Sequence, residues 1–191
     1  MHTVTPPRFH PLGIEQAPEA AKIRLILAEK ANGFTSNLLG VLAHAPTALE
    51  GYQNLSEINQ RNSLTPQQRE VVQLVAATAN GCGFCVAGHT ALSLNKFKLD
   101  AALVQALRDQ APLPDPQLEQ LALFARQLLL HKGAVDEANL EAFFHAGFSE
   151  QHALDVILGL SLATLCNFAN SLAQTPLNAP LKKYQWSRQH D

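Results

Sequence analysis

Apolar residues recur at the spacing of an α-helix along most of this chain, and no run alternates apolar and polar residues as a half-buried strand does. Signals for helix ends accompany this pattern. In "SLTPQQREVVQLVAATANG", Thr65 can cap a helix, Pro66 suits its first position, and Gln68 stands where a capping-box partner belongs. Asn80 and Gly81 are typical of the end of that helix. The sequence therefore predicts an all-α protein with eight or nine helices.

The chain has 191 residues, which suits a single domain. We expect an extended arm over residues 1–19, a helical lobe with a pair of cysteines over 20–110, a second helical lobe over 117–175, and a tail over 176–191. Only 16% of the residues are charged, against roughly 25% in an average globular protein. This low charge predicts much buried surface, including the interfaces of a homo-oligomer, whether a dimer, a trimer or a hexamer.

Charge and hydropathy exclude several kinds of partner. The formal net charge is −2 and no basic run is long enough to follow a phosphate backbone, so nucleic acid is not expected to bind. The N-terminal "MHTVTPPRFHPLGIEQ" lacks the features of a signal peptide, which favours a cytoplasmic protein. The longest apolar stretch, "VILGLSLATLC" at 156–166, is shorter than the roughly 20 residues that span a bilayer. We expect it to be a buried helix, with no membrane partner.

The stretch "TANGCGFCVAGHTAL" contains the residues most suited to chemistry. If Cys82 lies at the start of the helix that follows the turn, Cys85 and His89 share one face with it. A helix N-terminus stabilises a thiolate, so Cys85, inside the first turn and close to His89, is the better placed nucleophile. His89 could act as its base, and the turn could return Glu70 to His89. Cys82 is close enough to attack a sulfenic acid on Cys85 and form a disulfide.

Other interpretations of the same residues remain open. Cysteine often behaves as a small buried hydrophobic residue, so the pair could serve packing alone. Two cysteines, a histidine and a carboxylate could also bind zinc, although structural zinc sites usually use two separated ligand pairs and no second pair is present. A thioredoxin fold is not expected, because its cysteine pair follows a strand and this pair follows a predicted helix.

A weak internal repeat relates two segments of the chain. Without gaps, residues 64–86 align with residues 148–170, and the identical positions include Cys82 with Cys166. In the second copy, Ala169 stands in place of the second cysteine of the pair, so that copy would have lost its chemistry. If the repeat is real, we expect Cys166 to be a packing residue.

The spacing of the chemical residues resembles a family signature. Glu70, eleven residues, Cys82-Gly-Phe-Cys85, three residues and then His89 are similar to the motif of the AhpD-like alkylhydroperoxidase branch of the carboxymuconolactone decarboxylase family. "GFTSNLLGVLAHAPTALEGY", "HAGFSEQHALDVI" and "NFANSLAQTPLNAPL" resemble its longer, peroxidase-related members. The resemblance implies an AhpD-like helical bundle with a CxxC-containing helix hairpin, covering residues 1–191 as one domain.

The resemblance also implies a function. Cys85 would be the peroxidatic thiol and Cys82 the partner that closes the disulfide, while Glu70 and His89 would form a proton relay. The substrates would be hydrogen peroxide or organic hydroperoxides, a lipoylated or other dithiol protein would reduce the disulfide, and no cofactor would be needed beyond the cysteine pair. That branch carries a histidine where this sequence has Phe84. Phe84 cannot transfer a proton, so the relay must run through His89 and Glu70 alone.

Two other functions are consistent with the same residues. The protein could be a non-enzymatic redox-sensing or zinc-binding oligomeric module that uses the same cysteine pair. It could also be a small-molecule lyase that uses a cavity between the helices. The lactone decarboxylase branch works without this cysteine pair, so decarboxylation is not expected.

Overall fold

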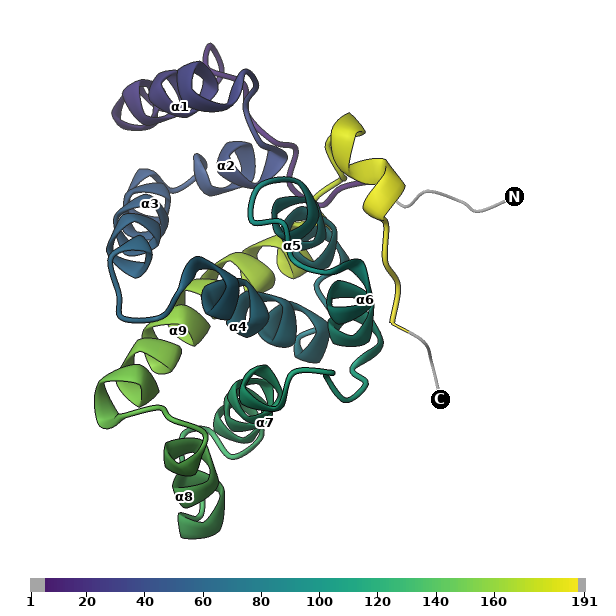
Figure 1. The fold of residues 1–191 in the computed structure, drawn as a ribbon. Helices are drawn as coiled ribbons and strands as arrows, with labels where there is room; N and C mark the ends of the chain where they lie inside the picture. Colours follow the sequence, from purple (N-terminus) through teal and green to yellow (C-terminus); the bar gives the residue numbers. More distant parts are fainter. Residues whose placement is uncertain (1–5, 189–191) are drawn as a thin grey trace.

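The computed structural model describes residues 6–188, and within that range the chain is helical with no strand (Figure 1). The α-helices, in chain order, are α1 (Glu19–Asn32), α2 (Asn37–Leu42), α3 (Pro46–Gln60), α4 (Pro66–Ala79), α5 (Gly83–Asn95), α6 (Ala101–Asp109), α7 (Pro116–Leu130), α8 (Glu137–His145) and α9 (Glu150–Ala173). A short 3₁₀ helix, η1 (Ala179–Tyr184), follows α9. The predicted all-α class is confirmed.

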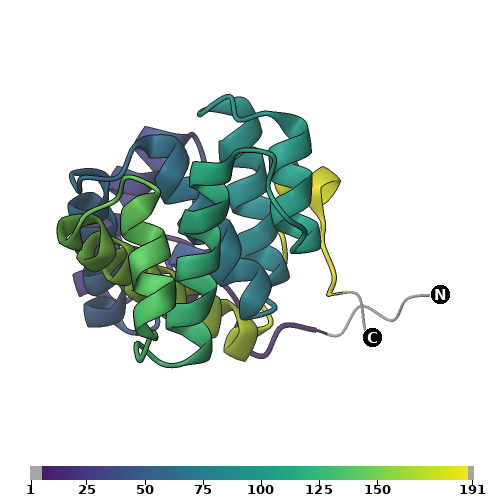
Figure 2. The same cartoon turned by 60° about the horizontal axis from the view of Figure 1, so that its bottom comes forward.

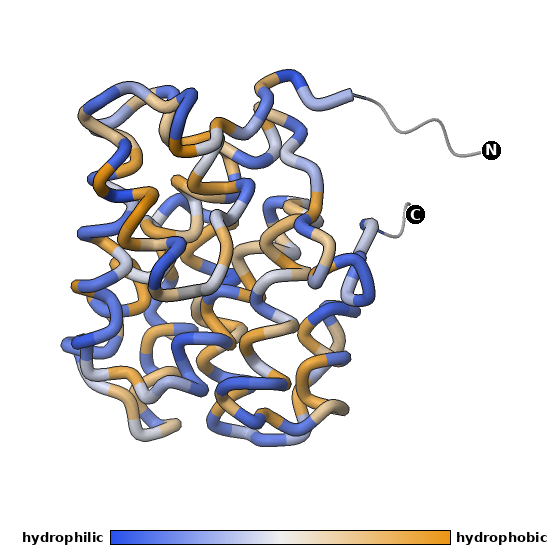
Figure 3. The backbone as a smooth tube through the Cα atoms, turned by 90° about the horizontal axis from the view of Figure 1, so that it is seen from above, coloured by the Kyte–Doolittle hydropathy of each residue, from blue (hydrophilic) through white to orange (hydrophobic). Residues whose placement is uncertain are grey.

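The helix α4 lies at the centre of the bundle, in contact with α5, α6, α7 and α9 (Figures 1 and 2). Its residues Val71, Val72, Leu74 and Val75 are almost completely buried. The outer helices show hydrophobic and hydrophilic segments in turn, as expected where one side of a helix faces the core (Figure 3). Because α4 is covered on several sides, every residue from Glu70 to Thr78 is buried, including the Glu70 carboxylate.

Local signals explain the hairpin that α4 and α5 form. Thr65 and Gln68 make the predicted capping box, with a Gln68 N–H to Thr65 Oγ1 distance of 3.2 Å and a Thr65 N–H to Gln68 Oε1 distance of 2.8 Å. Asn80 ends α4, and Gly81 adopts φ +68°, which glycine does without strain. Cys82 is then the N-cap of α5. The CxxC segment therefore opens the second helix of a hairpin, as the sequence predicts.

The N-terminal arm lies against the body of the same chain. Of the arm predicted over residues 1–19, residues 1–5 fall outside the described range. The Arg8 N–H donates to the carbonyl of the last residue of α9 at 2.9 Å, and the Leu12 N–H donates to Gly40 O in α2 at 3.0 Å. A Cβ on Gly40 would lie 2.8 Å from Leu12 O, so glycine allows this close approach of two backbones.

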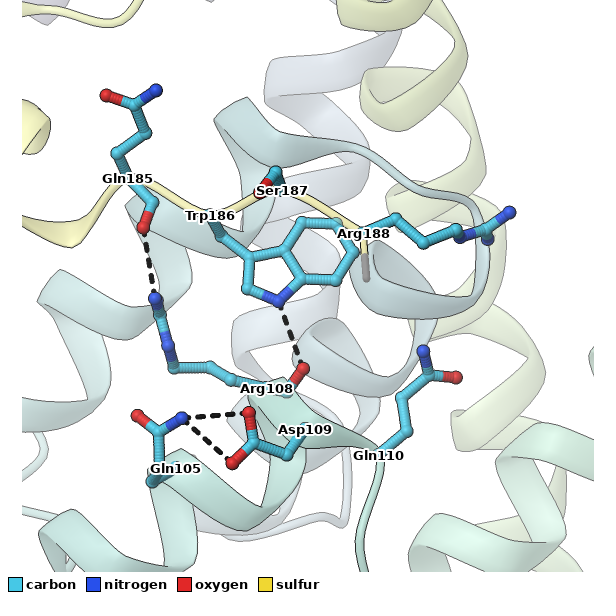
Figure 4. A pocket seen from close by; sticks show the side chains of 8 residues that line it. All are labelled: Gln105, Arg108, Asp109, Gln110, Gln185, Trp186, Ser187 and Arg188. Atoms are coloured by element: carbon cyan, nitrogen blue, oxygen red, sulfur yellow. Dashed lines mark hydrogen bonds between the residues drawn. The ribbon is translucent and has the colours of Figure 1, made fainter. Parts of the chain in front are cut away.

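The C-terminal segment is fastened to α6, and it crosses the start of α5. The Arg108 guanidinium donates to Gln185 O at 3.1 Å, and Trp186 Nε1 donates to Arg108 O at 3.0 Å (Figure 4). A polar cavity of about 580 Å³ lies beside these residues and contains no thiol. Trp186 O would lie 2.9 Å from a Cβ on Gly83, so the glycine of the CxxC motif lets this segment pass. The predicted tail includes residues 189–191, which are outside the described range.

The long helix α9 behaves as a core helix. Among the described residues it is the one helix long and apolar enough to cross a membrane by length and composition, but half of its most apolar 18-residue window is buried inside the fold. It contacts α2, α3, α4, α5 and α7. Val156 and Ala163 are fully buried, and Leu160 and Cys166 nearly so. The predicted burial of the 156–166 stretch holds for one face of the helix, while Ile157 is 44% exposed, and the helix itself is longer than that stretch.

The internal repeat has a counterpart at two helix starts. Thr65 and Ser149 occupy aligned positions, and each opens a capping box, one at α4 and the other at α9. Beyond these starts the two segments differ, because α4 ends at the Asn80-Gly81 turn whereas α9 continues through the aligned position. Cys82 therefore caps a helix, while Cys166 lies within one.

Three aromatic rings join α7, α8 and α9. The Phe143 ring on α8 stacks on Phe124 of α7 with centroids 4.0 Å apart, and on Phe148, just before α9, with centroids 4.5 Å apart. Phe143 is completely buried. Such a stack contributes both buried apolar area and ring–ring attraction.

Phe143→Ala is expected to lower the free energy of unfolding by about 3–5 kcal/mol, because it leaves a cavity between two stacked rings. Chemical denaturation followed by circular dichroism measures the change. Phe34→Ala is the matched control, since Phe34 is 41% exposed, and we expect it to change stability by less than about 1 kcal/mol. Equal effects of the two substitutions would contradict this account of the stack.

Candidate active site

The α4–α5 hairpin brings Glu70 and His89 into contact. His89 Nδ1 and Glu70 Oε2 lie 2.9 Å apart, so the predicted pairing of these two residues exists. Glu70 is 6% exposed, and its Oε2 also accepts a hydrogen bond from the fully buried Ser93 hydroxyl at 3.4 Å. His89 and Ser93 are one turn apart on α5 and both face Glu70 on α4. The carboxylate is thus held from two positions on one helix, and Nε2 is the histidine nitrogen left for a substrate.

The charge of His89 depends on this contact. Burial disfavours the imidazolium, but the charge of Glu70 and its hydrogen bond outweigh burial, and together they raise the pKa of His89 above its ordinary value of 6.5. The negative Cys85 sulfur acts in the same direction. The contact therefore favours the protonated form of His89 relative to a free imidazole.

Cys82 and Cys85 are in direct contact at the start of α5. Their Sγ atoms lie 2.6 Å apart, with the Cys82 thiol as donor, and the Cys85 N–H donates to Cys82 Sγ at 3.3 Å. This capping contact fixes the Cys82 side chain against the first turn. Both cysteines are reduced and buried. The cysteine pair lies at the start of a helix, as predicted, and Cys82 is the N-cap residue.

Cys85 is the thiol that its surroundings ionise. Hydrogen bonds from the thiols of Cys166 and Cys82 outweigh the effect of burial and hold the pKa of Cys85 well below its ordinary value of 9.0. The Asn170 amide donates to Cys85 Sγ at 3.3 Å, and the positive charge of His89 adds to the effect. The pKa values of Cys82 and Cys166 are raised, because each donates its proton to Cys85 and is buried. One thiolate with two thiol donors is the favoured state.

The sequence interpretation missed Cys166 and Asn170. Both come from α9, one turn apart: the Asn170 amide donates to the Cys85 sulfur, and Cys166 lowers the pKa of Cys85 more than any other neighbour. The expectation that Cys166 only packs is therefore revised: it is buried, but it also acts on the pKa of Cys85. The internal repeat marked Cys166 as the equivalent of Cys82, and that alignment was the one signal in the sequence that singled it out.

Two cavities approach the cysteines from different sides. The first, here called the relay cavity, has a volume of about 210 Å³ and is lined by both members of the Glu70–His89 pair and by Cys166. The second, here called the helix-start groove, has a volume of about 320 Å³ and is lined by Cys82 and Asn170. Cys85 lines neither and is 4% exposed. The thiolate thus lies between two thiols that face different cavities.

Other residues give the two cavities different characters. Tyr52, Arg69 and Lys96 contribute polar and cationic groups to the relay cavity. Phe84 lines the helix-start groove, on the Cys82 side. Phe84 is apolar and faces the groove, whereas His89, paired with Glu70, carries the positive charge that acts on Cys85.

The described part of the chain contains no group of three or more His, Cys, Asp or Glu side chains arranged to hold a metal ion. Glu70 and His89 are paired with each other, and Cys82 and Cys85 are paired at a distance of 2.6 Å. The four residues expected to share a site are thus arranged as two contacting pairs, which gives the zinc alternative no geometric support.

Residues 46–127, from α3 into α7, match the model of the carboxymuconolactone decarboxylase family. Over this segment the chain is similar to that family. It contains Glu70, Cys82, Cys85 and His89, so the resemblance predicted from their spacing is confirmed. A comparison with curated proteins finds no match.

Solved structures extend the likeness to the whole fold. A peroxidase-related protein from Ralstonia eutropha JMP134, described as an alkylhydroperoxidase AhpD core, has a TM-score of 0.81 at 22% identity, over 93% of this chain and 96% of that chain. One from Silicibacter sp. TM1040 has a TM-score of 0.77 at 20% identity, over 94% and 97%. A debrominase in complex with 2,3,4-tribromopyrrole has a TM-score of 0.74 at 14% identity, over 96% of each chain. The predicted AhpD-like fold is confirmed.

Proposed function

We propose that this protein is a thiol-dependent peroxidase that reduces hydrogen peroxide or organic hydroperoxides, with Cys85 as the attacking thiol. The observation that supports this most is the combination of a cysteine that favours the thiolate with a histidine that favours the imidazolium, one helical turn apart. Cleavage of an O–O bond needs a nucleophile at one oxygen and a proton donor for the other. Cys85 and His89 supply these two functions.

In the first step, the Cys85 thiolate attacks the terminal oxygen of the peroxide. The O–O bond breaks, Cys85 becomes a sulfenic acid, and the other oxygen leaves as an alkoxide or hydroxide. His89 gives this oxygen a proton from Nε2, because Nδ1 is engaged by Glu70 at 2.9 Å. Glu70 orients the ring and stabilises the imidazolium before the proton leaves.

In the second step, the Cys82 sulfur attacks the oxidised Cys85 sulfur. An S–S bond forms, the sulfenic hydroxyl leaves, and with the Cys82 proton it becomes water. The Cys82 sulfur already lies 2.6 Å from Cys85, so little movement is required. A dithiol reductant, such as a lipoylated protein, then attacks the disulfide at Cys82, which lines the helix-start groove.

The assembly that we propose is a homo-oligomer in the cytoplasm. Several large apolar side chains of α1 and α9 are exposed, and they are the surfaces that subunit contacts would cover. On α1 these are Ile23 and Leu27, which are 59% and 58% exposed, and on α9 they are Leu154 and Phe168, which are 67% and 60% exposed.

The experiment that tests the function is consumption of cumene hydroperoxide or hydrogen peroxide by the purified protein, with dihydrolipoamide or dithiothreitol as reductant. We expect many peroxide molecules to be consumed per subunit, with one dithiol oxidised for each. Consumption no greater than that of reductant alone would contradict the proposal.

A second candidate activity is reductive dehalogenation by the same thiols. The likeness to a debrominase with bound tribromopyrrole favours it, because that protein has the same fold over nearly the whole of both chains. The same assay with a bromopyrrole in place of the peroxide distinguishes the two activities. Release of bromide without peroxide consumption would favour the second.

A further inference from the structure

Cys85 has a thiol neighbour on each of two sides, and the two neighbours differ in what they face. Cys82 belongs to the same helical turn and lines the helix-start groove. Cys166 belongs to α9 and lines the relay cavity, together with Glu70 and His89. The proposed disulfide uses only the first of these neighbours. The second neighbour, Cys166, is a buried thiol beside the nucleophile, and the proposed mechanism does not use it.

The contacts of Cys166 hold it beside Cys85. Its thiol donates to Ala163 O in the preceding turn of α9 at 3.3 Å, and Cys166 is the neighbour that lowers the pKa of Cys85 most. Asn170, one turn further along, donates to the same sulfur at 3.3 Å. Side chains from two consecutive turns of α9, Cys166 and Asn170, therefore lie beside Cys85. Cys166 is 4% exposed, so what exposure it has is toward the relay cavity.

We propose that Cys166 is a third redox thiol of this site, which forms a disulfide with Cys85 and so links α5 to α9. The inference rests on the proposed function for its oxidant in the cell. After the peroxide has converted Cys85 to a sulfenic acid, the Cys166 sulfur attacks the Cys85 sulfur. The S–S bond forms, the S–O bond breaks, and the hydroxyl leaves with the Cys166 proton as water.

This disulfide exchanges with the one at the helix start. The Cys82 thiolate attacks the Cys85 sulfur, the Cys85–Cys166 bond breaks, and Cys166 recovers a proton as it leaves. The product is the Cys82–Cys85 disulfide, with no net oxidation or reduction. Exchange thus carries the oxidised state from a thiol that faces the relay cavity to one that faces the helix-start groove, where a reductant can reach it. In the intact protein the inter-helix disulfide is an intermediate.

The test traps the intermediate by removing Cys82. Cys82→Ser keeps a strong N-cap residue at the start of α5, so we expect the variant to fold, and far-ultraviolet circular dichroism checks this. The variant is oxidised with diamide, which joins neighbouring thiols without peroxide, then alkylated, digested and mapped by mass spectrometry. We expect most subunits to contain the Cys85–Cys166 disulfide. The double variant Cys82→Ser/Cys166→Ser is the matched control and should contain no disulfide within a subunit.

A mapped result in which Cys166 remains fully alkylated after diamide, while Cys85 is oxidised, would overturn the inference. If Cys82→Ser does not fold, Cys82→Ala replaces it and the same criterion applies. Because diamide needs no peroxidase activity, the two proposals fail separately. Absence of peroxide turnover in the wild-type protein would remove the proposed function, and the Cys85–Cys166 disulfide formed with diamide would still stand.

Discussion

Cys85→Ser is expected to lower the rate of peroxide consumption by at least about a hundredfold, to the level of reductant alone. Loss of the attacking atom removes the covalent step, and a serine hydroxyl is not ionised near neutral pH. The Cys85 sulfur accepts hydrogen bonds from Cys82 and Asn170, and it is the one thiol of the three whose pKa is lowered, so no other thiol in the site has its reactivity. Steady-state consumption of cumene hydroperoxide with dithiothreitol measures the change.

The control for this substitution is Cys82→Ser, which separates attack from disulfide formation. It should keep a first turnover at the wild-type rate, because Cys85 remains, but lose sustained turnover as Cys85 is trapped in an oxidised form. Peroxide consumption by Cys85→Ser at the wild-type rate would show that another residue carries the reaction.

Glu70→Gln should lower the peroxidase rate by a factor on the order of a thousand, within the range of losses seen when acid–base assistance is removed. The amide cannot supply the negative charge that raises the pKa of His89, and burial alone lowers it. His89 should then be neutral near pH 7, without a proton for the leaving oxygen. The rate is measured as a function of pH, and the alkaline limb assigned to His89 should move to lower pH in the variant.

The same substitution should change how stability depends on pH. The folded pKa of His89 is raised, so the pair with Glu70 contributes stability that is complete below the ordinary value of 6.5 and is lost as pH rises through the folded pKa. In Glu70→Gln, the free energy of unfolding should not show this decrease as the pH rises above 6.5. Glu141→Gln, at an exposed position on α8, is the matched control and should leave both profiles unchanged. An unshifted rate profile in Glu70→Gln would contradict the relay.

Much of the hairpin could be predicted because its signals are local. Thr65 and Gln68 mark the start of α4, and the Asn80-Gly81 turn marks its end, so the positions of the CxxC segment and of Glu70 follow from neighbouring residues. The 2.9 Å contact between Glu70 and His89 is the consequence of a short turn between two antiparallel helices. Pairings of this kind need only helix ends and helical periodicity.

Contacts made by distant segments could not be predicted in the same way. Cys166 and Asn170 reach Cys85 because α9 packs across α4 and α5, which no local pattern specifies. Trp186 crosses Gly83 for the same kind of reason: hydrogen bonds between side chains and backbone carbonyls tie this segment to α6, and they carry no sequence signature. The apolar sequence of a helix such as α9 predicts only that the helix is buried. Which of its faces lies against the thiolate depends on how the helices pack.

The most direct test of the account is mass mapping of the wild-type cysteines after addition of one equivalent of hydrogen peroxide per subunit. We predict that the peroxide is consumed, that Cys82 and Cys85 are joined in most subunits, and that Cys166 is recovered as a free thiol once exchange is complete. Recovery of Cys82 and Cys85 as free thiols, with the peroxide unconsumed, would contradict the central claim that these residues form a peroxidase site.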